Sequence, residues 1–154
     1  MKKIVMCFGA FDGLHAGHED YFRQAKQHGD ELIVIIARNT TIVELTGELP
    51  ARSEEERLKR VVEHPMVDDA RLGYDDDKYR IIEELKPDIV CLGHDQDAFT
   101  ENLDTELYRR GISPQIYRCD PYEPAPPFKM PSYETYEEEN NFAEAEYEDR
   151  GLPL

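Results

Sequence analysis

The stretch KIVMCFGAFDGLHAGHEDYF, residues 3 to 22, contains an apolar run, a turn with several glycines, and two histidines three positions apart. Lys3 to Phe8 is apolar after its first residues and is followed by Gly9, which predicts a short buried strand. From Gly17 to Gly29 the apolar side chains recur at helical spacing, and the last glycine is a typical C-terminal stop. The stretch therefore predicts a strand that turns directly into a helix, with both histidines at the turn.

The rest of the chain continues this alternation of strands and helices. Residues 31 to 38, ELIVIIAR, form an apolar run of the kind found in strands that are covered on both faces of a parallel sheet. We expect further strands at Val67–Leu72, Asp88–Leu92 and Gln115–Cys119, helices after the capping box Ser53–Glu56, at Lys78–Lys86 and at Phe99–Arg110, and a loop within Asn39–Arg52. This order predicts an α/β fold: a Rossmann-like, doubly wound parallel sheet.

Two predicted strand ends carry residues suited to ligand binding. Gly9 to His18 follows the first strand, and Gly93 to Gln96 follows the strand DIVCL. In doubly wound sheets, ligands bind at the carboxyl ends of the strands, where the strand order reverses. We therefore expect the functional site at these two segments.

Residues 1–120 are expected to form one domain, followed by a Pro-rich segment and an acidic tail at 121–154. The segment PYEPAPPFKMP has five prolines in eleven residues, which excludes a regular helix or an inner strand. From Pro131 onward there are eight acidic residues and one basic residue, a net charge of −7. Such a tail is mobile or drapes on the surface as a helix.

The overall charge and the apolar pattern exclude several classes of function. The formal net charge of −16 opposes binding to DNA, RNA or anionic membranes. No apolar run approaches the ~20 residues of a membrane span, and the N-terminal sequence lacks a signal-peptide pattern, so we expect a cytoplasmic protein. The three cysteines form no C-x-x-C pair and lie in or beside apolar segments, which predicts buried, reduced thiols.

The two histidines at the turn admit three interpretations. They can simply cap a turn, or bind zinc with His94 as a third ligand, although the cysteines lie at unsuitable spacings for zinc. Alternatively, His15 and His18 lie at a helix N-terminus, where unpaired amides and the helix dipole favour a phosphate. Gly17 would then allow close approach of a bulky ligand. A G-x-G-x-x-G dinucleotide loop is absent, which argues against a nicotinamide or flavin cofactor bound in that way.

The residues from Gly9 to His18 read G-x-F-D-x-x-H-x-G-H, which resembles the signature of the cytidylyltransferase-like nucleotidyltransferases. The later segments GDELIVIIARNTTI, EEERLKRV and KPDIVCLGHDQ are similar to archaeal FAD synthases, and glycerol-3-phosphate cytidylyltransferase is a nearby relative. The resemblance extends from residue 3 to about residue 120.

The resemblance implies that a phosphate oxygen of a small acceptor attacks the α-phosphorus of ATP or CTP and that pyrophosphate leaves. It implies catalytic roles for His15, His18 and Arg57, with Arg57 reaching the β- and γ-phosphates. The residues that it implies for nucleotide binding are Gly9, Ala10, Phe11, Asp12, Gly17, Arg38, Gly93, Asp95, Gln96, Lys129 and Ser132. Mg²⁺ is implied near Asp12. FMN is favoured as the acceptor over glycerol-3-phosphate or a similar polyol phosphate, and homodimers are common in the family.

Three departures from the family pattern leave a catalytically impaired nucleotide-binding module as an alternative. Asn39 stands where many relatives have an aspartate. The loop TIVELTGELPARS has no lysine, although relatives often carry lysines there, and Arg52 is its sole cation. In place of a late Ser/Thr-rich motif the sequence reads PPFKMPSYETY, in which Lys129 and Ser132 are either remnants of the motif or unrelated to it. The first change removes a negative charge, and the other two remove positive charges or phosphate donors.

Overall fold

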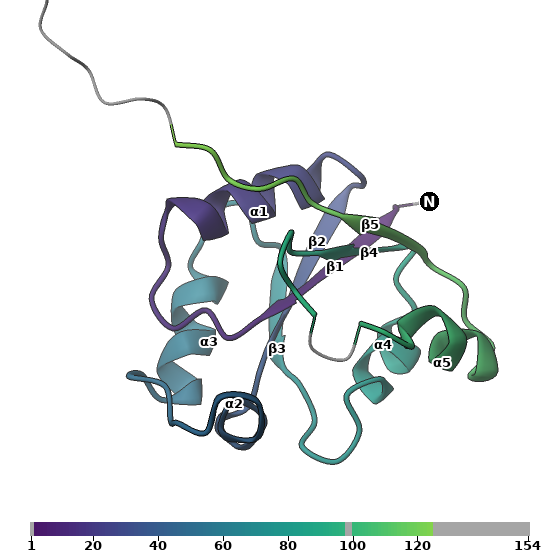
Figure 1. Ribbon diagram of the computed structural model, residues 1–154. Helices are drawn as coiled ribbons and strands as arrows, with labels where there is room; N and C mark the ends of the chain where they lie inside the picture. The colour runs from purple at the N-terminus through teal and green to yellow at the C-terminus, as the bar shows by residue number, and fades with distance from the viewer. Residues whose placement is uncertain (1, 98–99, 125–154) are drawn as a thin grey trace, which may run out of the picture. The chain divides into compact units, whose positions relative to one another are not determined.

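The computed structural model describes residues 2–97 and 100–124, and its five strands form one parallel sheet in the order β3-β2-β1-β4-β5 (Figure 1). The strands are β1 (Ile4–Gly9), β2 (Glu31–Ile36), β3 (Asp69–Leu72), β4 (Ile89–Leu92) and β5 (Gln115–Arg118). The helices are α1 (Ala16–Lys26), α2 (Asn39–Thr46), α3 (Glu54–Val62), α4 (Arg80–Leu85) and α5 (Leu103–Arg109). The predicted Rossmann-like fold is confirmed.

The central strand β1 lies where the strand order reverses. It pairs with β2 along its whole length, from Ile4 opposite Glu31 to Gly9 opposite Ile36, and its other edge pairs with β4. The chain therefore builds the sheet outward through β2 and β3, and then returns to add β4 and β5 on the other side. This reversal places the carboxyl ends of β1 and β4 side by side, where a doubly wound sheet binds its ligands.

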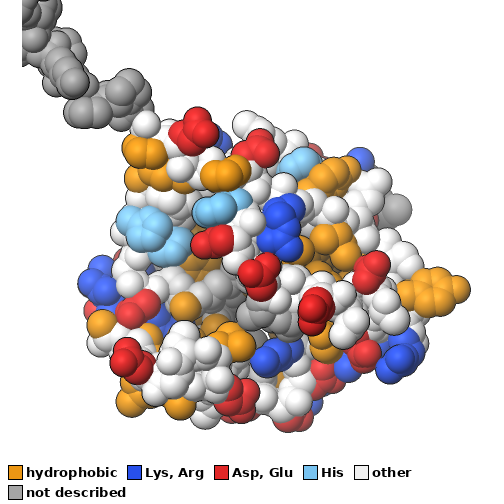
Figure 2. All heavy atoms as spheres, viewed as in Figure 1, with side chains coloured by type: hydrophobic (Ala, Val, Ile, Leu, Met, Phe, Trp, Pro, Cys, Tyr) orange, Lys and Arg blue, Asp and Glu red, His pale blue; other side chains and the backbone are white. Residues whose placement is uncertain are grey.

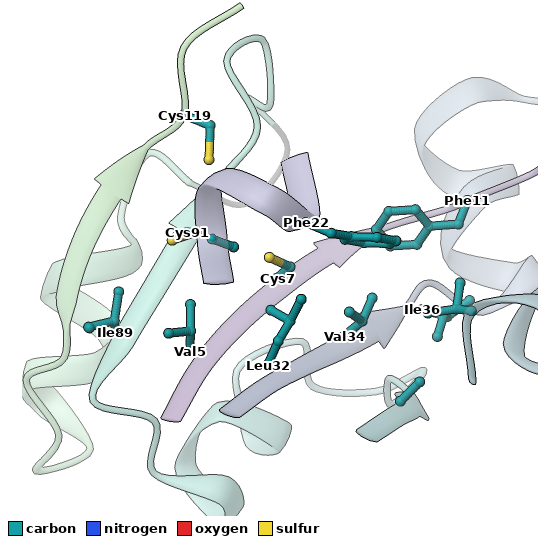
Figure 3. Close-up of a cluster of buried hydrophobic side chains, with 13 residues drawn as sticks. Val5, Cys7, Phe11, Phe22, Leu32, Val34, Ile36, Ile89, Cys91 and Cys119 are labelled. Atoms are coloured by element: carbon teal, nitrogen blue, oxygen red, sulfur yellow. The ribbon is translucent and has the colours of Figure 1, made fainter. Parts of the chain in front are cut away.

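The core consists of two hydrophobic clusters, one on each face of the sheet. Val5 and Cys7 of β1 belong to the cluster covered by α1 and α3, of which Figure 3 shows the side chains. Met6 and Phe8 belong to the cluster covered by α4 and α5. Successive side chains of a strand point to opposite faces, so a strand covered on both faces is apolar throughout. This explains the uninterrupted apolar runs in the sequence.

The three cysteines are buried and free, as predicted. Cys7, Cys91 and Cys119 all lie in the cluster beneath α1 (Figure 3). Burial raises the pKa of the Cys7 thiol, with a further contribution from Cys119. A protonated, buried thiol behaves as a small apolar side chain, so Cys7 serves packing.

The segment expected to contain a loop is partly helical. Residues 39–46 form α2, which ends at Gly47 in the left-handed region, with φ 81°, and only residues 47–53 form the loop. The predicted loop is confirmed, and the helix before it was not predicted because Ile42 is the only buried residue of α2. A helix with one buried position lacks the repeated apolar face from which helices are recognised.

Two other helix boundaries differ from the predictions. α5 begins at Leu103, and the earlier start expected for it, Phe99, lies outside the described residues. α1 ends at Lys26, and Gly29 does not adopt the left-handed conformation expected of a helix stop. A Cβ on Gly29 would lie 2.6 Å from Cγ2 of Val5, so the glycine allows this turn to pack closely against β1.

The capping box predicted at the start of α3 is half confirmed. The Ser53 hydroxyl accepts a hydrogen bond from the Glu56 amide at 3.2 Å. The Glu56 carboxylate pairs with Arg60, one turn further along the helix.

Within the described ranges, no helix is both long and apolar enough to cross a membrane.

Candidate active site at the carboxyl ends of β1 and β4

The turn between β1 and α1 is shaped by a glycine beneath an aromatic ring. Phe11 has a positive φ of 52° and is 2% exposed, so its ring folds back into the core. A Cβ on Gly9 would lie 2.8 Å from the Cζ atom of that ring. Gly9 is therefore required by close packing, and the turn after β1 is held in one conformation.

His15 and His18 form the N-terminal cap of α1. The Nδ1 atom of His15 accepts from the Gly17 amide at 3.0 Å, and the His18 Nδ1 atom accepts from the His15 amide at 3.4 Å. The two rings stack with their centroids 3.8 Å apart. In Figure 2, histidine side chains gather on this face of the molecule. Both imidazoles thus lie at a helix N-terminus, as predicted, and neutral His15 carries its proton on Nε2.

His18 is held in its neutral form at pH 7. Burial and the neighbouring His15 lower its pKa to about 4, while a backbone hydrogen bond with Gly13 acts in the opposite direction. His18 therefore offers hydrogen bonding without a full positive charge. An anion bound beside it would favour the imidazolium form and raise the pKa.

A cavity of about 380 Å³ opens beside His18. It extends from the carboxyl ends of β1 and β4 to α2 and to the segment between β3 and α4. Eight of the residues implied by the family resemblance line it, namely Gly9, Ala10, Phe11, His18, Arg38, Gly93, Asp95 and Gln96. The far part of the cavity has aliphatic and aromatic walls, formed by Ile35, Ile42, Leu45, Tyr74 and Ile81.

The loop after β4 is held by its own side chains and by β5. The Gln96 carboxamide oxygen accepts from the Gly93 amide at 3.0 Å. Arg118 donates to the carbonyl oxygens of Gly93 and Gln96 at 2.9 and 3.0 Å. The Asp95 side chain lines the cavity, is 82% exposed and lies 3.8 Å from Nδ1 of the neighbouring His94.

Arg57 is completely buried, which is rare for a charged side chain. Its Nη1 atom donates to the carbonyl oxygens of Ala10 and Ala37 at 2.7 and 2.8 Å, and Nη2 donates to the Asn39 side chain at 2.8 Å. Arg57 thereby joins the turn after β1, the end of β2 and the start of α2. These bonds give it a positioning role, and direct contact with phosphates stays a prediction.

The comparison with known proteins identifies the family. The family model described as cytidylyltransferase-like matches residues 6–141. The chain belongs to the cytidylyltransferase-like family. It is accordingly a nucleotidyltransferase, as the resemblance predicted. An FAD synthase of Thermoplasma acidophilum is 40% identical over 119 residues, which cover 77% of this chain and 83% of that protein. An FAD synthase of Methanobrevibacter ruminantium is 41% identical over 119 residues, covering 75% and 79%.

Solved structures share the fold of this cytidylyltransferase-like protein. A protein of Thermoplasma volcanium, described as a lipopolysaccharide core biosynthesis protein, is 37% identical, with a TM-score of 0.75 over 80% of this chain and all of that chain. A pantoate-beta-alanine ligase of Francisella tularensis is 17% identical, with a TM-score of 0.56 over 93% of this chain and 70% of that chain. The second likeness concerns the fold alone.

In this cytidylyltransferase-like protein, Asp12 does not fit the role of a metal ligand. Its carboxylate accepts from the backbone amides of Ala51 and Arg52 at 2.7 and 3.0 Å. The hydrogen bond from the Ala51 amide holds the pKa of Asp12 below its ordinary value. The backbone hydrogen bond and the positive charge of Arg52 lower this pKa further. No group of three metal-ligating side chains occurs in the parts of the chain that the structure describes. Asp12 instead ties the turn after β1 to the loop before α3.

The structure also identifies lining residues that the sequence reasoning missed. They come from α2, from the segment between β3 and α4, and from α4 itself, and they comprise Thr41, Ile42, Leu45, Thr46, Gly73, Tyr74, Lys78 and Ile81. Asp12, His15, Gly17 and Arg57 do not line the cavity of this cytidylyltransferase-like site. Lys129 and Ser132 lie outside the described residues.

Proposed function

We propose that this protein transfers the AMP moiety of ATP to the phosphate of FMN, forming FAD and releasing pyrophosphate. One observation carries the proposal: a single cavity joins His18, at the N-terminus of α1, to a wall of aliphatic and aromatic side chains. The first part suits a triphosphate, and the second suits a flat apolar ring. The 40% identical relative named FAD synthase supports the same reaction.

The proposed reaction needs no covalent enzyme intermediate. An oxygen of the FMN phosphate attacks the α-phosphorus of ATP and forms a new P–O bond. The bond between the α-phosphorus and the bridging oxygen breaks, and its electron pair leaves with pyrophosphate. The chain has to align the two phosphates and to stabilise the charge that develops on them, and these two effects dominate catalysis of phosphoryl transfer.

His18 is the residue proposed to act at the reacting phosphates. It lines the cavity, lies at the helix N-terminus and is neutral before substrate binds. In the free protein, its Nδ1 atom accepts from the His15 amide and its N–H bonds to the backbone of Gly13. When substrate binds, this N–H would turn from Gly13 to the α-phosphate, and the new hydrogen bond would strengthen as negative charge accumulates there. His15 supports His18 because the two rings stack and both residues form the helix cap. The His15 side chain is exposed to solvent. Gly17 keeps the helix end open to the triphosphate.

The segment Gly93–Gln96 is proposed to bind the nucleoside. It lies on the β4 side of the histidines, so it faces the nucleoside if the triphosphate lies along α1. Arg38 and the buried Arg57 are proposed to hold the opposite wall in place. Magnesium normally accompanies a triphosphate and is held mostly by phosphate oxygens and water. Because Asp12 is committed to backbone amides, no step is assigned to the metal here.

The cavity walls also bear on the choice of acceptor. A polyol phosphate such as glycerol-3-phosphate needs hydrogen-bonding partners, and the far wall offers few of them. The isoalloxazine ring of FMN would instead remove this apolar surface from water, at roughly 25 cal/mol per Å². The wall therefore favours FMN over a polyol phosphate.

Pyrophosphate release tests the proposed function directly. The protein is incubated with Mg²⁺ and either ATP or CTP, together with FMN, glycerol-3-phosphate or no acceptor. Release that requires both ATP and FMN, with FAD as the product, is the expected result. Release with CTP and glycerol-3-phosphate would replace this function with the cytidylyl alternative. Binding of ATP without release in any mixture would identify an impaired nucleotide-binding module.

A further inference from the structure

The cavity contains one cationic side chain without an acidic partner in the described part of the chain. Arg38 also lines the cavity, but its guanidinium pairs with Glu54 at 3.0 Å and donates to the carbonyl oxygen of Gly73 at 2.8 Å. Lys78 lines the same cavity, is half-buried, and forms no ion pair among the described residues. In a protein with a net charge of −16, a lysine that lines a cavity without an acidic partner among the described residues is an exception.

The acidic residues that precede Lys78 are all engaged elsewhere. The run DDD at residues 75–77 would neutralise the lysine if its carboxylates turned toward it. Each carboxylate instead has its own partner, and these partners are, in order, Thr40, Arg80 and Arg110. The bond from Thr40 also joins the start of α2 to this segment, which lies across from α2 in Figure 1. The chain thus keeps Lys78 available while holding the two walls together.

Tyr74 forms a fixed aromatic wall in the same segment. The guanidinium carbon of Arg80 lies 3.6 Å from the centre of the Tyr74 ring, and the Tyr74 hydroxyl donates to Glu84 at 2.7 Å. Arg80 in turn pairs with Glu84 at 3.7 Å. These three contacts fix the orientation of the ring, and a fixed aromatic surface loses little entropy when a flat ligand packs on it.

We propose that the segment Gly73–Tyr79, between β3 and α4, recognises the acceptor in two separate ways. Lys78 holds the acceptor's phosphate, and Tyr74 packs against its ring. Lys78 would then supply, from another part of the chain, the positive charge that the lysine-free loop at 41–53 lacks. This inference rests on the proposed function, because it takes FMN as the acceptor.

The two contacts are separated by comparing FMN with riboflavin, which has the same ring and no phosphate. Binding of each flavin is followed by quenching of flavin fluorescence. Lys78→Gln is expected to weaken FMN binding by about 10- to 100-fold, the range of one hydrogen bond to a charged group, and to leave riboflavin binding unchanged. Lys78→Arg should recover part of the preference for FMN. Tyr74→Ala should weaken both flavins by similar factors, roughly 3- to 10-fold.

Lys59→Gln is the matched control, because Lys59 is exposed on α3 and lies outside the cavity lining. It changes the net charge equally and is expected to leave both flavins bound as in the wild type. If the wild type forms FAD but Lys78→Gln binds FMN normally, the inference is wrong and the proposed function stands. If the wild type neither binds FMN nor forms FAD, both are wrong. Equal weakening of FMN and riboflavin by Lys78→Gln would also overturn the assigned phosphate contact.

Discussion

The two sides of the cavity are built in different ways. On the α1 side, the contacts of His15 and His18 join residues two or three positions apart, within one turn and one helix cap. On the α2 side, the wall depends on contacts between residues 35 positions apart, from Arg38 to Gly73 and from Thr40 to Asp75. The first side is a local structure that a short motif encodes. The second exists only once β2 and β3 have paired.

Arg57 and Asp12 connect these two sides. Arg57 bonds to the backbone of both the turn after β1 and the end of β2. Asp12 bonds from the same turn to the loop before α3. The positions of the histidines and of the far wall therefore depend on the hydrogen bonds that these two residues make. Substitutions at these residues and at His18 test how far the two sides are independent.

The largest effect is expected from Arg57→Met. The substitution leaves the carbonyl oxygens of Ala10 and Ala37 buried without their donor, at a cost of about 3 kcal/mol or more in the free energy of unfolding. Denaturant unfolding measures the loss. Arg60→Met, on the exposed surface of the same helix, is the control and should change stability little. An Arg57 variant as stable as this control would show that the connection between the two sides is dispensable.

The next largest effect is expected from His18→Ala, which removes the side chain at the proposed reaction centre. We expect kcat for FAD formation to fall by about 100-fold or more, with a folded protein that still binds ATP. Steady-state kinetics and ATP titration measure the two quantities. His28→Ala is the control, since His28 stacks on Tyr117 and does not line the cavity. An unchanged kcat in the His18 variant would show that His18 has no catalytic role.

A smaller effect is expected from Asp12→Asn, which weakens the tie to the loop before α3. We expect KM for ATP to rise by about 3- to 10-fold with a smaller change in kcat, because an amide accepts less strongly from the two backbone N–H groups. Asp104→Asn, at an exposed position of α5, is the control and should leave KM for ATP unchanged. The pKa of Asp12 is lowered in the folded protein, so the tie is intact above the carboxylate's ordinary pKa and is lost as pH falls through the lowered value.

The smallest effect concerns the titration of His18 itself. NMR titration should give a pKa of about 4 for its ring in the free protein, against ~6.5 for an unperturbed histidine. The unfolded chain then binds more protons between these two values, so His18 lowers stability as pH falls from 6.5 toward 4. Bound ATP should move the titration upward. A ring that titrates near 6.5 without ligand would contradict its burial beside His15.

The strands and the histidine cap were predictable because their signals are local. A strand covered on both faces is apolar throughout, so the apolar runs of the sequence predicted β1, β2 and β4. α2 was not, because only Ile42 is buried and its helical period is not repeated. The hydrogen bonds of Arg57 could not be predicted either, because a charged residue on a helix is expected to be exposed unless its neighbours in space are known.

The sequence by itself determined the order of strands and helices, the turn with the two histidines and the membership of a nucleotidyltransferase family. These features depend on residues close together in the chain or on a motif of fixed spacing. The tertiary structure alone decided that Arg57 is buried, that Asp12 is bound to backbone amides, and that Tyr74 and Lys78 share a cavity with His18. The physical reason is that hydrogen bonds, burial and charge pairing between distant segments arise only when the parallel sheet brings its carboxyl ends together.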